Sequence, residues 1–191
     1  MDKLFKLLYD QLPNKKAVCG IMGNLKAESA LKTNNLQNSF ENKYGNDDEY
    51  TRKVNTKEIS KDAFIYDSAG YGLAQWTFWS RKKFLYENTV EKGLSIDDLQ
   101  GQVNTIIQEL KIYKLYDVLL SCKDVKMASD LILTQYEKPA NQSTTVSIIR
   151  AKYGEEFYTK YCGEKTDISE IVTQATILRD MLNKFLNSSY N

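Results

Sequence analysis

One glutamate in the sequence stands on a predicted helix face that is otherwise apolar. The residues of this face are spaced three, four and three apart: Val18, Ile21, Leu25 and Glu28. A carboxylate at the end of such a helix, predicted over residues 15–29, is partly desolvated and close to the negative end of the helix dipole. Both effects favour its protonated form. Glu28 is therefore a candidate general acid, and the alternative is an ordinary surface glutamate in the last helical turn.

The chain contains no histidine. Zinc amidases and zinc peptidases need histidine ligands, and cysteine and serine hydrolases need a histidine base, so these mechanisms are excluded. The three cysteines fit neither a zinc cluster nor a redox pair, and we interpret them as buried or free thiols. No metal or organic cofactor is expected. Carboxylate chemistry remains, and it is the chemistry that cleaves glycosidic bonds.

Hydrolysis of a glycosidic bond usually needs a second carboxylate, which activates water or stabilises the transition state. Asp67, just ahead of the glycines at 70 and 72, is the leading candidate, although it could equally cap a turn. The other candidates are Glu41, Asp47, Asp48 and Glu137.

Several aromatic and polar residues could contact sugar rings. The aromatic candidates are Tyr71, Trp76, Trp79 and Tyr136, although such clusters are more often core than binding platforms. Glu137 could bond near the acid or cap the preceding helix. Asn141 could donate to an N-acetyl group or cap the helix expected from about residue 142.

Three segments, in this order, carry a family resemblance: GNLKAES at 23–29, SAGYGLAQW at 68–76 and YEKPAN at 136–141. They resemble the motifs of phage tail-associated lysozymes, which belong to the lysozyme-like superfamily together with goose-type lysozymes and lytic transglycosylases. With the weaker KYG and FY matches that follow, the resemblance spans roughly residues 15–162.

The resemblance implies a mainly α, lysozyme-like fold with a small extended or hairpin segment beside a cleft. It implies that Glu28 is the acid and that Gln75 positions substrate or water. Some relatives carry an acid two residues beyond this glutamine, where the present chain has Thr77. The implied reaction is hydrolysis of the β-1,4 bond between N-acetylmuramic acid and N-acetylglucosamine in peptidoglycan.

The resemblance implies a lysozyme-like catalytic domain over residues 1–165. The periodicity predicts a C-terminal helix within 166–191, which packs on the domain or leads to a further cell-wall-binding or tail module. Residues 30–66 are expected to be a long loop with short helices, and 64–76 an extended or hairpin segment. Beyond these, helices are expected at 78–92, 97–111, 113–121, 124–136, 142–161 and 167–187.

Composition favours a single globular domain without nucleic-acid or membrane partners. The net charge is +1, and no apolar run approaches the roughly 18 residues that a membrane span needs. The N-terminus lacks the features of a signal peptide. We expect synthesis in a host cytoplasm and action on the wall after holin release or from a virion tail; a domain starting near Met1 slightly favours an endolysin.

Two other functions remain open at this stage. A lytic transglycosylase would use the same acid but let the muramyl C6 hydroxyl attack in place of water. A non-catalytic wall-binding or tail module would keep the fold without the chemistry.

Overall fold

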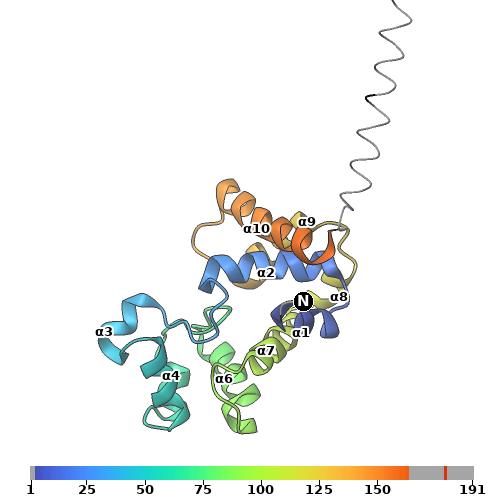
Figure 1. The fold of residues 1–191 in the computed structure, drawn as a ribbon. Helices are drawn as coiled ribbons and strands as arrows, with labels where there is room; N and C mark the ends of the chain where they lie inside the picture. Colours follow the sequence, from blue (N-terminus) through green and yellow to red (C-terminus); the bar gives the residue numbers. More distant parts are fainter. Residues whose placement is uncertain (1–2, 164–178, 180–191) are drawn as a thin grey trace, which may run out of the picture.

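The structure, a computed structural model, describes residues 3–163 and residue 179, and these are arranged almost entirely in helices (Figure 1). The α-helices are α1 (Lys3–Gln11), α2 (Lys15–Ser29), α3 (Glu41–Tyr44), α4 (Asp47–Asn55), α5 (Lys61–Tyr66), α6 (Trp79–Asn88), α7 (Leu99–Ile112), α8 (Tyr116–Leu120), α9 (Val125–Leu131) and α10 (Thr144–Cys162). Two 3-10 turns, η1 (Asn38–Phe40) and η2 (Val90–Lys92), and one π-helical segment, η3 (Ile132–Glu137), complete the order. The mainly α fold class predicted from the sequence is confirmed.

Helix α2 lies at the centre of the helical body, beside α9 and α10 (Figure 1). Its start is fixed by Asn14, whose side-chain oxygen accepts from the backbone N–H groups of Lys16 and Ala17 at 3.0 and 3.2 Å. The Asn14 amide also donates to the carbonyl of Cys122 at 2.9 Å. One capping residue therefore starts the helix and ties it to the chain that follows α8. The predicted helix over 15–29 is confirmed with the same bounds.

Small residues let α2 approach its neighbours closely. A Cβ atom on Gly20 would lie 2.8 Å from the Cβ of Ala128 on α9, and one on Gly23 would lie 2.4 Å from the carbonyl oxygen of Arg150 on α10. On the α10 side, a Cβ on Gly154 would lie 3.0 Å from the Cys19 carbonyl oxygen. Any larger side chain at these points would force the helices apart. The approach brings the end of α2 next to Arg150.

The core runs continuously beneath these helices. It buries side chains from most of the described helices, including Phe5, Leu8, Val18, Ile21, Met22, Leu25, Phe64, Leu73, Trp76, Val103, Ile106, Leu110 and Ile132. Each fully buried aliphatic or aromatic side chain contributes about 1.5–3 kcal/mol to folding. The apolar face of α2 is thus core up to Leu25, and Glu28 stands at its rim.

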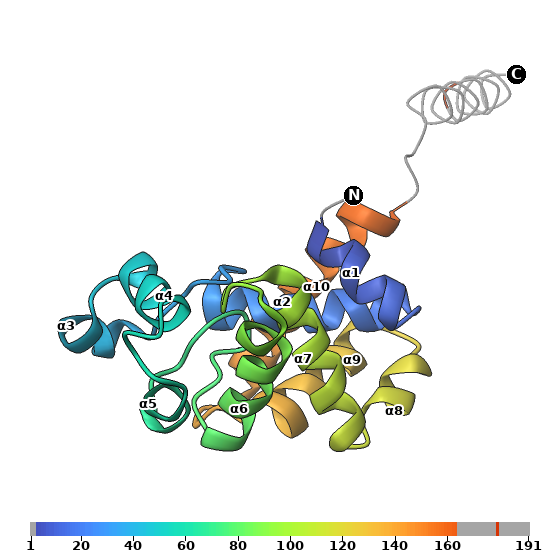
Figure 2. The same ribbon diagram turned by 90° about the horizontal axis from the view of Figure 1, so that it is seen from below.

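Helices α3 and α4 lie beyond the end of α2, and α5, which packs against α6, completes this group (Figure 2). The chain returns from this group through residues 67–78, where two isolated bridges pair Tyr71 with Leu36 and with Trp76. The backbone N–H of Trp76 donates to the Tyr71 carbonyl at 2.9 Å and that of Tyr71 donates back at 3.2 Å. This closed turn, Tyr71–Trp76, is the small extended segment expected beside the site.

Several element boundaries differ from those expected. Residues 64–66 belong to α5, because Ser60 caps a helix there by accepting from the Ala63 N–H. The helix expected at 124–136 divides into α9 and the π-helical η3. The helix expected at 167–187 lies outside the described residues. None of the helices that the structure describes is long and apolar enough to cross a membrane.

Candidate active site

Glu28 lies in the last turn of α2 and is paired with an arginine from α10. Arg150 Nη2 lies 2.5 Å from Glu28 Oε1, and the two side chains are 9% and 19% exposed. A charge-assisted bond of this length fixes the orientation of the carboxyl group. The Glu28 carboxyl group is therefore fixed in orientation and has limited access to solvent. It is not an ordinary surface glutamate.

Arg150 also contacts Asn24, one turn before Glu28 on α2. Its Nη1 donates to Asn24 Oδ1 at 3.2 Å. The Asn24 amide is buried and donates to the backbone carbonyls of Gly20 and Ser129 at 3.0 and 3.1 Å, and to the Ser129 hydroxyl at 3.0 Å. Asn24 and Glu28 are four residues apart and share a helix face. Asn24 and Glu28 of the first motif thus both accept hydrogen bonds from the Arg150 guanidinium.

Ser29 of the first motif ties the end of α2 to the turn formed by the second. Its hydroxyl lies 2.9 Å from the Leu73 carbonyl and 3.1 Å from that of Leu25. The helix ends directly afterwards, because Ala30 and Leu31 have positive φ angles of 53° and 64°. The acidic residue is therefore presented at a sharp helix end, braced against the Tyr71–Trp76 turn.

Gln75 has a positive φ of 43°, which is uncommon for a residue with a side chain. Its amide nitrogen donates to the carbonyls of Asn35 at 3.0 Å and Gly72 at 3.1 Å. Its amide oxygen lies over Gly70, where an added Cβ would come within 2.9 Å of it. Gln75 thus joins the turn to the loop that follows α2, and its strained backbone fits a functional position.

Asp67 occupies a buried structural position. Its Oδ1 accepts from the Ala69 N–H at 2.8 Å and pairs with the ammonium group of Lys82, while its Oδ2 accepts from the Tyr50 hydroxyl. The Asp67 carboxylate is only 2% exposed. Burial lowers the pKa of Lys82 to about 8, and the Asp67 charge opposes that shift. These contacts favour the turn-capping alternative for Asp67.

Two of the predicted sugar-contacting aromatics converge on a buried glutamate. Glu109 Oε2 accepts from the Trp76 indole at 2.9 Å and from the Tyr136 hydroxyl at 2.6 Å. Arg81 donates to both oxygens of the same carboxylate at 2.8 and 3.1 Å. Trp76 is fully buried and Tyr136 is 3% exposed. Both rings are part of the core, where they bond to Glu109. We therefore no longer propose that they bind sugar rings.

Glu137 follows Tyr136 at the end of the π-helical segment η3, and Lys138 after it has a positive φ of 49°. Short π-helical segments occur frequently at functional sites. Glu137 Oε1 is buried and has no hydrogen-bond partner among the described residues. Burial raises the pKa of Glu137 to about 8; Arg81 and Arg150 oppose the rise, and Glu28 and Glu109 add to it. Glu137 and Glu28 therefore belong to one electrostatic cluster.

The two remaining predicted contacts lie apart from this cluster. Tyr71 is fully buried, and its hydroxyl shares a 2.6 Å hydrogen bond with Thr51. Asn141 is exposed, and its side chain accepts from the Ser143 N–H at 3.0 Å, just ahead of α10. Asn141 thus shapes the turn before α10, two residues ahead of Ser143, which occupies the N-cap position.

Three exposed aromatic rings lie close to Thr77, which follows the second motif. Tyr66, Phe78 and Trp79 are 65%, 61% and 45% exposed. Tyr66 and Trp79 are stacked with ring centroids 6.2 Å apart. With Ile65, Ser68 and Thr77 they line a hollow of about 240 Å³. Of these rings only Trp79 was considered from the sequence, because aromatic spacing does not show which rings face outwards.

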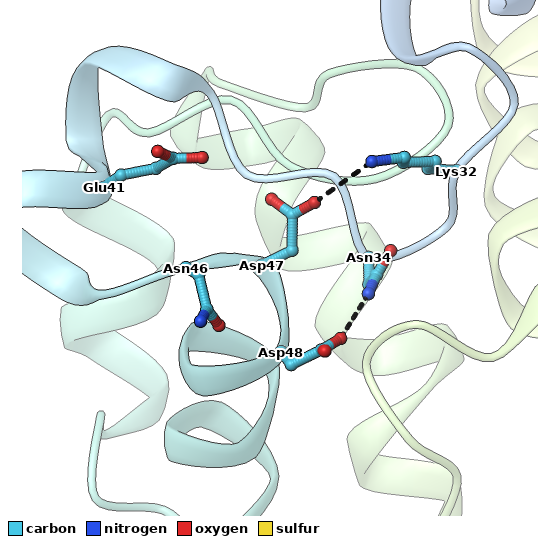
Figure 3. Close-up of a pocket in the computed structure, with 6 residues that line it drawn as sticks. All are labelled: Lys32, Asn34, Glu41, Asn46, Asp47 and Asp48. Atoms are coloured by element: carbon cyan, nitrogen blue, oxygen red, sulfur yellow. Dashed lines mark hydrogen bonds and ion pairs between the residues drawn. The ribbon is translucent and has the colours of Figure 1, made fainter.

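A polar hollow of about 360 Å³ lies between the loop after α2 and the start of α4 (Figure 3). It is lined by Lys32, Asn34, Glu41, Asn46, Asp47 and Asp48. Asp47 pairs with Lys32 at 3.7 Å and accepts from the Leu36 N–H at 2.9 Å, and Asp48 accepts from Asn34 at 2.7 Å. Both of these carboxylates are thus engaged in holding the loop to α4.

Within the described part of the chain, no group of three or more acidic or cysteine side chains is placed to hold a metal ion. The sequence reasoning missed Arg150 and Glu109, the two charged residues that organise the site. The SIIRAKYG segment that contains Arg150 carries no signal for its role, since an arginine in a helix is ordinarily a solvated residue.

The helical fold, with a glutamate presented at the end of a buried helix beside a tight glycine-containing turn, defines a lysozyme-like protein. The family model for phage tail lysozymes matches residues 1–161, and the chain belongs to this family. It is similar to "Morphogenesis protein 1" of Bacillus phage B103, with 26% identity over 149 residues, which are 73% of the present chain. The chain spans about a third of the length of that relative. The family suggests a lytic role against peptidoglycan.

Proposed function

We propose that the chain is a muramidase that hydrolyses the β-1,4 bond between N-acetylmuramic acid and N-acetylglucosamine, with Glu28 as the general acid. The observation that carries the proposal is the placement of Glu28. It is the carboxyl group at the exposed end of an otherwise buried helix, oriented by Arg150 at 2.5 Å and braced by Ser29 against the second motif. Glu28 donates its proton to the glycosidic oxygen as the bond to the anomeric carbon breaks.

Two hollows on the described surface offer contacts for a glycan strand. The hollow lined by Tyr66, Phe78 and Trp79 supplies flat apolar faces, with the hydroxyls of Ser68 and Thr77 beside them. The polar hollow near Lys32 begins four residues after Glu28 and offers amide and charged groups. A strand of N-acetylated sugars needs both kinds of contact, since each ring has an apolar face and a polar rim. Gln75 lies on the turn that joins these regions.

A lytic transglycosylase is the second candidate, and one observation favours it. Of the five candidates for a second carboxylate, Asp67, Asp47 and Asp48 are held by other side chains or backbone groups. Glu41 and Glu137 alone remain for that role. Intramolecular attack by the muramyl C6 hydroxyl needs no separate carboxylate to hold a water. The two reactions leave different sugar ends, and product analysis separates them.

We propose further that the enzyme acts from a virion tail, opening the wall as the phage enters. The family is that of phage tail lysozymes, and the relative from phage B103 is a morphogenesis protein. Antibodies against the chain should label the tails of intact virions in electron micrographs. Detection only in lysates of infected cells, with unlabelled virions, would support an endolysin instead.

The lytic proposal is tested by release of soluble fragments from purified peptidoglycan by wild type and Glu28→Gln. The amide keeps the size of the side chain but cannot donate the proton. We expect release by the wild type and almost none by the variant. Equal release by both would refute the assignment of Glu28, and no release by either would favour a wall-binding module.

A further inference from the structure

Gln102 on α7 is fully buried, although its side chain is polar. Its amide oxygen accepts from the Leu73 N–H at 2.9 Å. Its amide nitrogen donates to the backbone carbonyls of Thr33 at 2.7 Å and Ile96 at 3.2 Å. None of these three partners lies in a helix. A buried amide is costly unless its hydrogen bonds are made, and here both donors and the acceptor are used to join non-helical segments.

The contact with Leu73 connects Gln102 to the end of α2. Leu73 is held on both sides, because its N–H donates to Gln102 and its carbonyl accepts from the Ser29 hydroxyl at 2.9 Å. Ser29 directly follows Glu28 in the sequence. One residue of the Tyr71–Trp76 turn therefore links α7 to the helix end that carries the acid.

The contact with Thr33 forms a second link, to the loop that follows α2. Further along this loop, the Asn35 carbonyl accepts from the Gln75 side chain at 3.0 Å. Gln75 is half-buried, whereas Gln102 is fully buried. The loop is therefore joined to the Tyr71–Trp76 turn at two points, by Gln102 from within the core and by Gln75 nearer the surface.

Gly72 leaves the space that the Gln102 amide occupies. A Cβ atom on Gly72 would lie 2.8 Å from Gln102 Nε2 and 2.9 Å from its Oε1. Gly72 also has a positive φ of 74°, which favours glycine. This glycine of the second motif is thus required by the turn and by the buried amide together.

Helix α7 holds the same turn at a second place. Glu109 stands seven residues after Gln102, on the same helix face, and accepts from the Trp76 indole at 2.9 Å. Both side chains on α7 are fully buried. They fix Leu73 and Trp76, which lie on either side of Gln75 in the sequence.

We propose that Gln102 is a positioning residue for the reaction, which fixes the turn that carries Gln75 against the end of α2 that carries Glu28. This inference rests on the proposed function, in which Glu28 delivers its proton to the glycosidic oxygen. Gln102 is buried and acts through the turn and the loop, not on the substrate. Loss of its contacts lets the turn shift, and a displacement of about 1 Å at such a site costs up to about 100-fold in rate.

The kinetic test compares wild type, Gln102→Met and the control Thr105→Val. Methionine has a similar length but makes none of the three hydrogen bonds, so kcat on soluble peptidoglycan oligosaccharides should fall about 10- to 100-fold while KM stays within about twofold. The assay temperature is one at which circular dichroism shows all three proteins to be folded.

The control residue, Thr105, is buried on the same helix as Gln102. Its hydroxyl donates to the Gly101 carbonyl, within α7, at 2.9 Å. Thr105→Val therefore removes a buried hydrogen bond without touching the turn, and it should keep the kcat of the wild type even where it lowers stability.

A second measurement does not depend on lysis. Hydrogen exchange at the Leu73 N–H, followed by ¹⁵N NMR, should be at least about tenfold faster in Gln102→Met, because the acceptor of this N–H is gone. Exchange at Ile106, within α7, reports global unfolding, and the increase at Leu73 should exceed it. If Gln102→Met does not fold, Gln102→Asn, which is one methylene shorter and cannot reach all three partners, should show both effects.

The proposal is overturned if the folded variant keeps kcat within about twofold of the wild type, or if Thr105→Val loses as much. It is also overturned if exchange at Leu73 rises no more than at Ile106. Failure of the muramidase proposal looks different. In that case the wild type itself cleaves no oligosaccharide and the role of Gln102 in the reaction falls with it, while the exchange data still show whether Gln102 holds the turn.

Discussion

Arg150 Nη2 on α10 lies 2.5 Å from Glu28 Oε1 on α2, across 122 residues of sequence. The contact exists because Gly23 and Gly154 allow the two helices to approach until backbone atoms nearly touch. The same guanidinium contacts Asn24, so three functional groups are fixed by one helix crossing. The close packing of α2 against α10 therefore brings Glu28, Asn24 and Arg150 together.

Removing the arginine should impair lysis more than it impairs folding. Arg150→Gln leaves Glu28 without its orienting partner, and a misplaced acid costs about 10- to 100-fold in rate. Fragment release by the purified variant measures the effect. Lys152→Gln removes an exposed positive charge from the same helix and should retain full activity. Equal losses in both variants would mean that the arginine acts only through net charge.

We expect Asp67 to stabilise the fold and to take no part in catalysis. Asp67→Asn leaves the buried Lys82 ammonium without its counter-charge, and breaking a buried ion pair in this way costs about 3–5 kcal/mol. Thermal unfolding should show the loss. The double variant Asp67→Asn with Lys82→Met should recover part of it, since no buried charge remains. An active-site base would instead show normal stability with lysis abolished.

The protonated carboxyl of Glu137 should contribute stability that is lost as the pH rises from about 4.5 to about 8. Burial raises the pKa of Glu137 to about 8 in the folded protein, so in this window the folded state holds a proton that the unfolded state has released. The free energy of unfolding then decreases by up to about 1.4 kcal/mol per pH unit. Glu137→Gln lacks this titration, and its advantage over the wild type should grow across the same window. A difference in the free energy of unfolding between wild type and Glu137→Gln that stays constant with pH would contradict a raised pKa for Glu137.

The exposed aromatic hollow should contribute to glycan binding. Trp79→Ala removes the ring that stacks on Tyr66, and loss of one stacked sugar should weaken binding about fivefold, equivalent to about 1 kcal/mol. The affinity is measured with Trp79→Ala introduced into the Glu28→Gln variant, which is titrated with soluble peptidoglycan oligosaccharides that it should not cleave. Met127→Ala, an equally exposed apolar residue on α9, is the matched control. Unchanged affinity in Trp79→Ala would exclude the hollow as a sugar subsite.

Much of the helical order was predictable from periodicity and capping. The helix over 15–29 is correct because Asn14 caps it and its apolar stripe is real core. The helix at 99–112 is likewise marked by Asp98, which accepts from the Gly101 N–H at 2.8 Å. The Ser95 hydroxyl, three residues before Asp98, bonds to Asp97.

The site was only partly predictable, because its polar contacts join residues far apart in the chain. Periodicity places Glu28 at the end of a buried face, and the family resemblance predicts that Gln75 lies near it. Neither reveals Arg150, and neither distinguishes the buried ring of Trp76 from the exposed ring of Trp79. The indole N–H of Trp76 donates to the buried carboxylate of Glu109, 33 residues away, and nothing in the sequence indicates that contact.

The most direct test of the account is mass spectrometry of the soluble fragments released from purified Gram-positive peptidoglycan by wild type and Glu28→Gln. The account predicts fragments with reducing-end N-acetylmuramic acid, made by the wild type alone. Anhydromuramyl ends would show a lytic transglycosylase that uses the same acid. Muramic acid ends released equally by both proteins would contradict the role of Glu28.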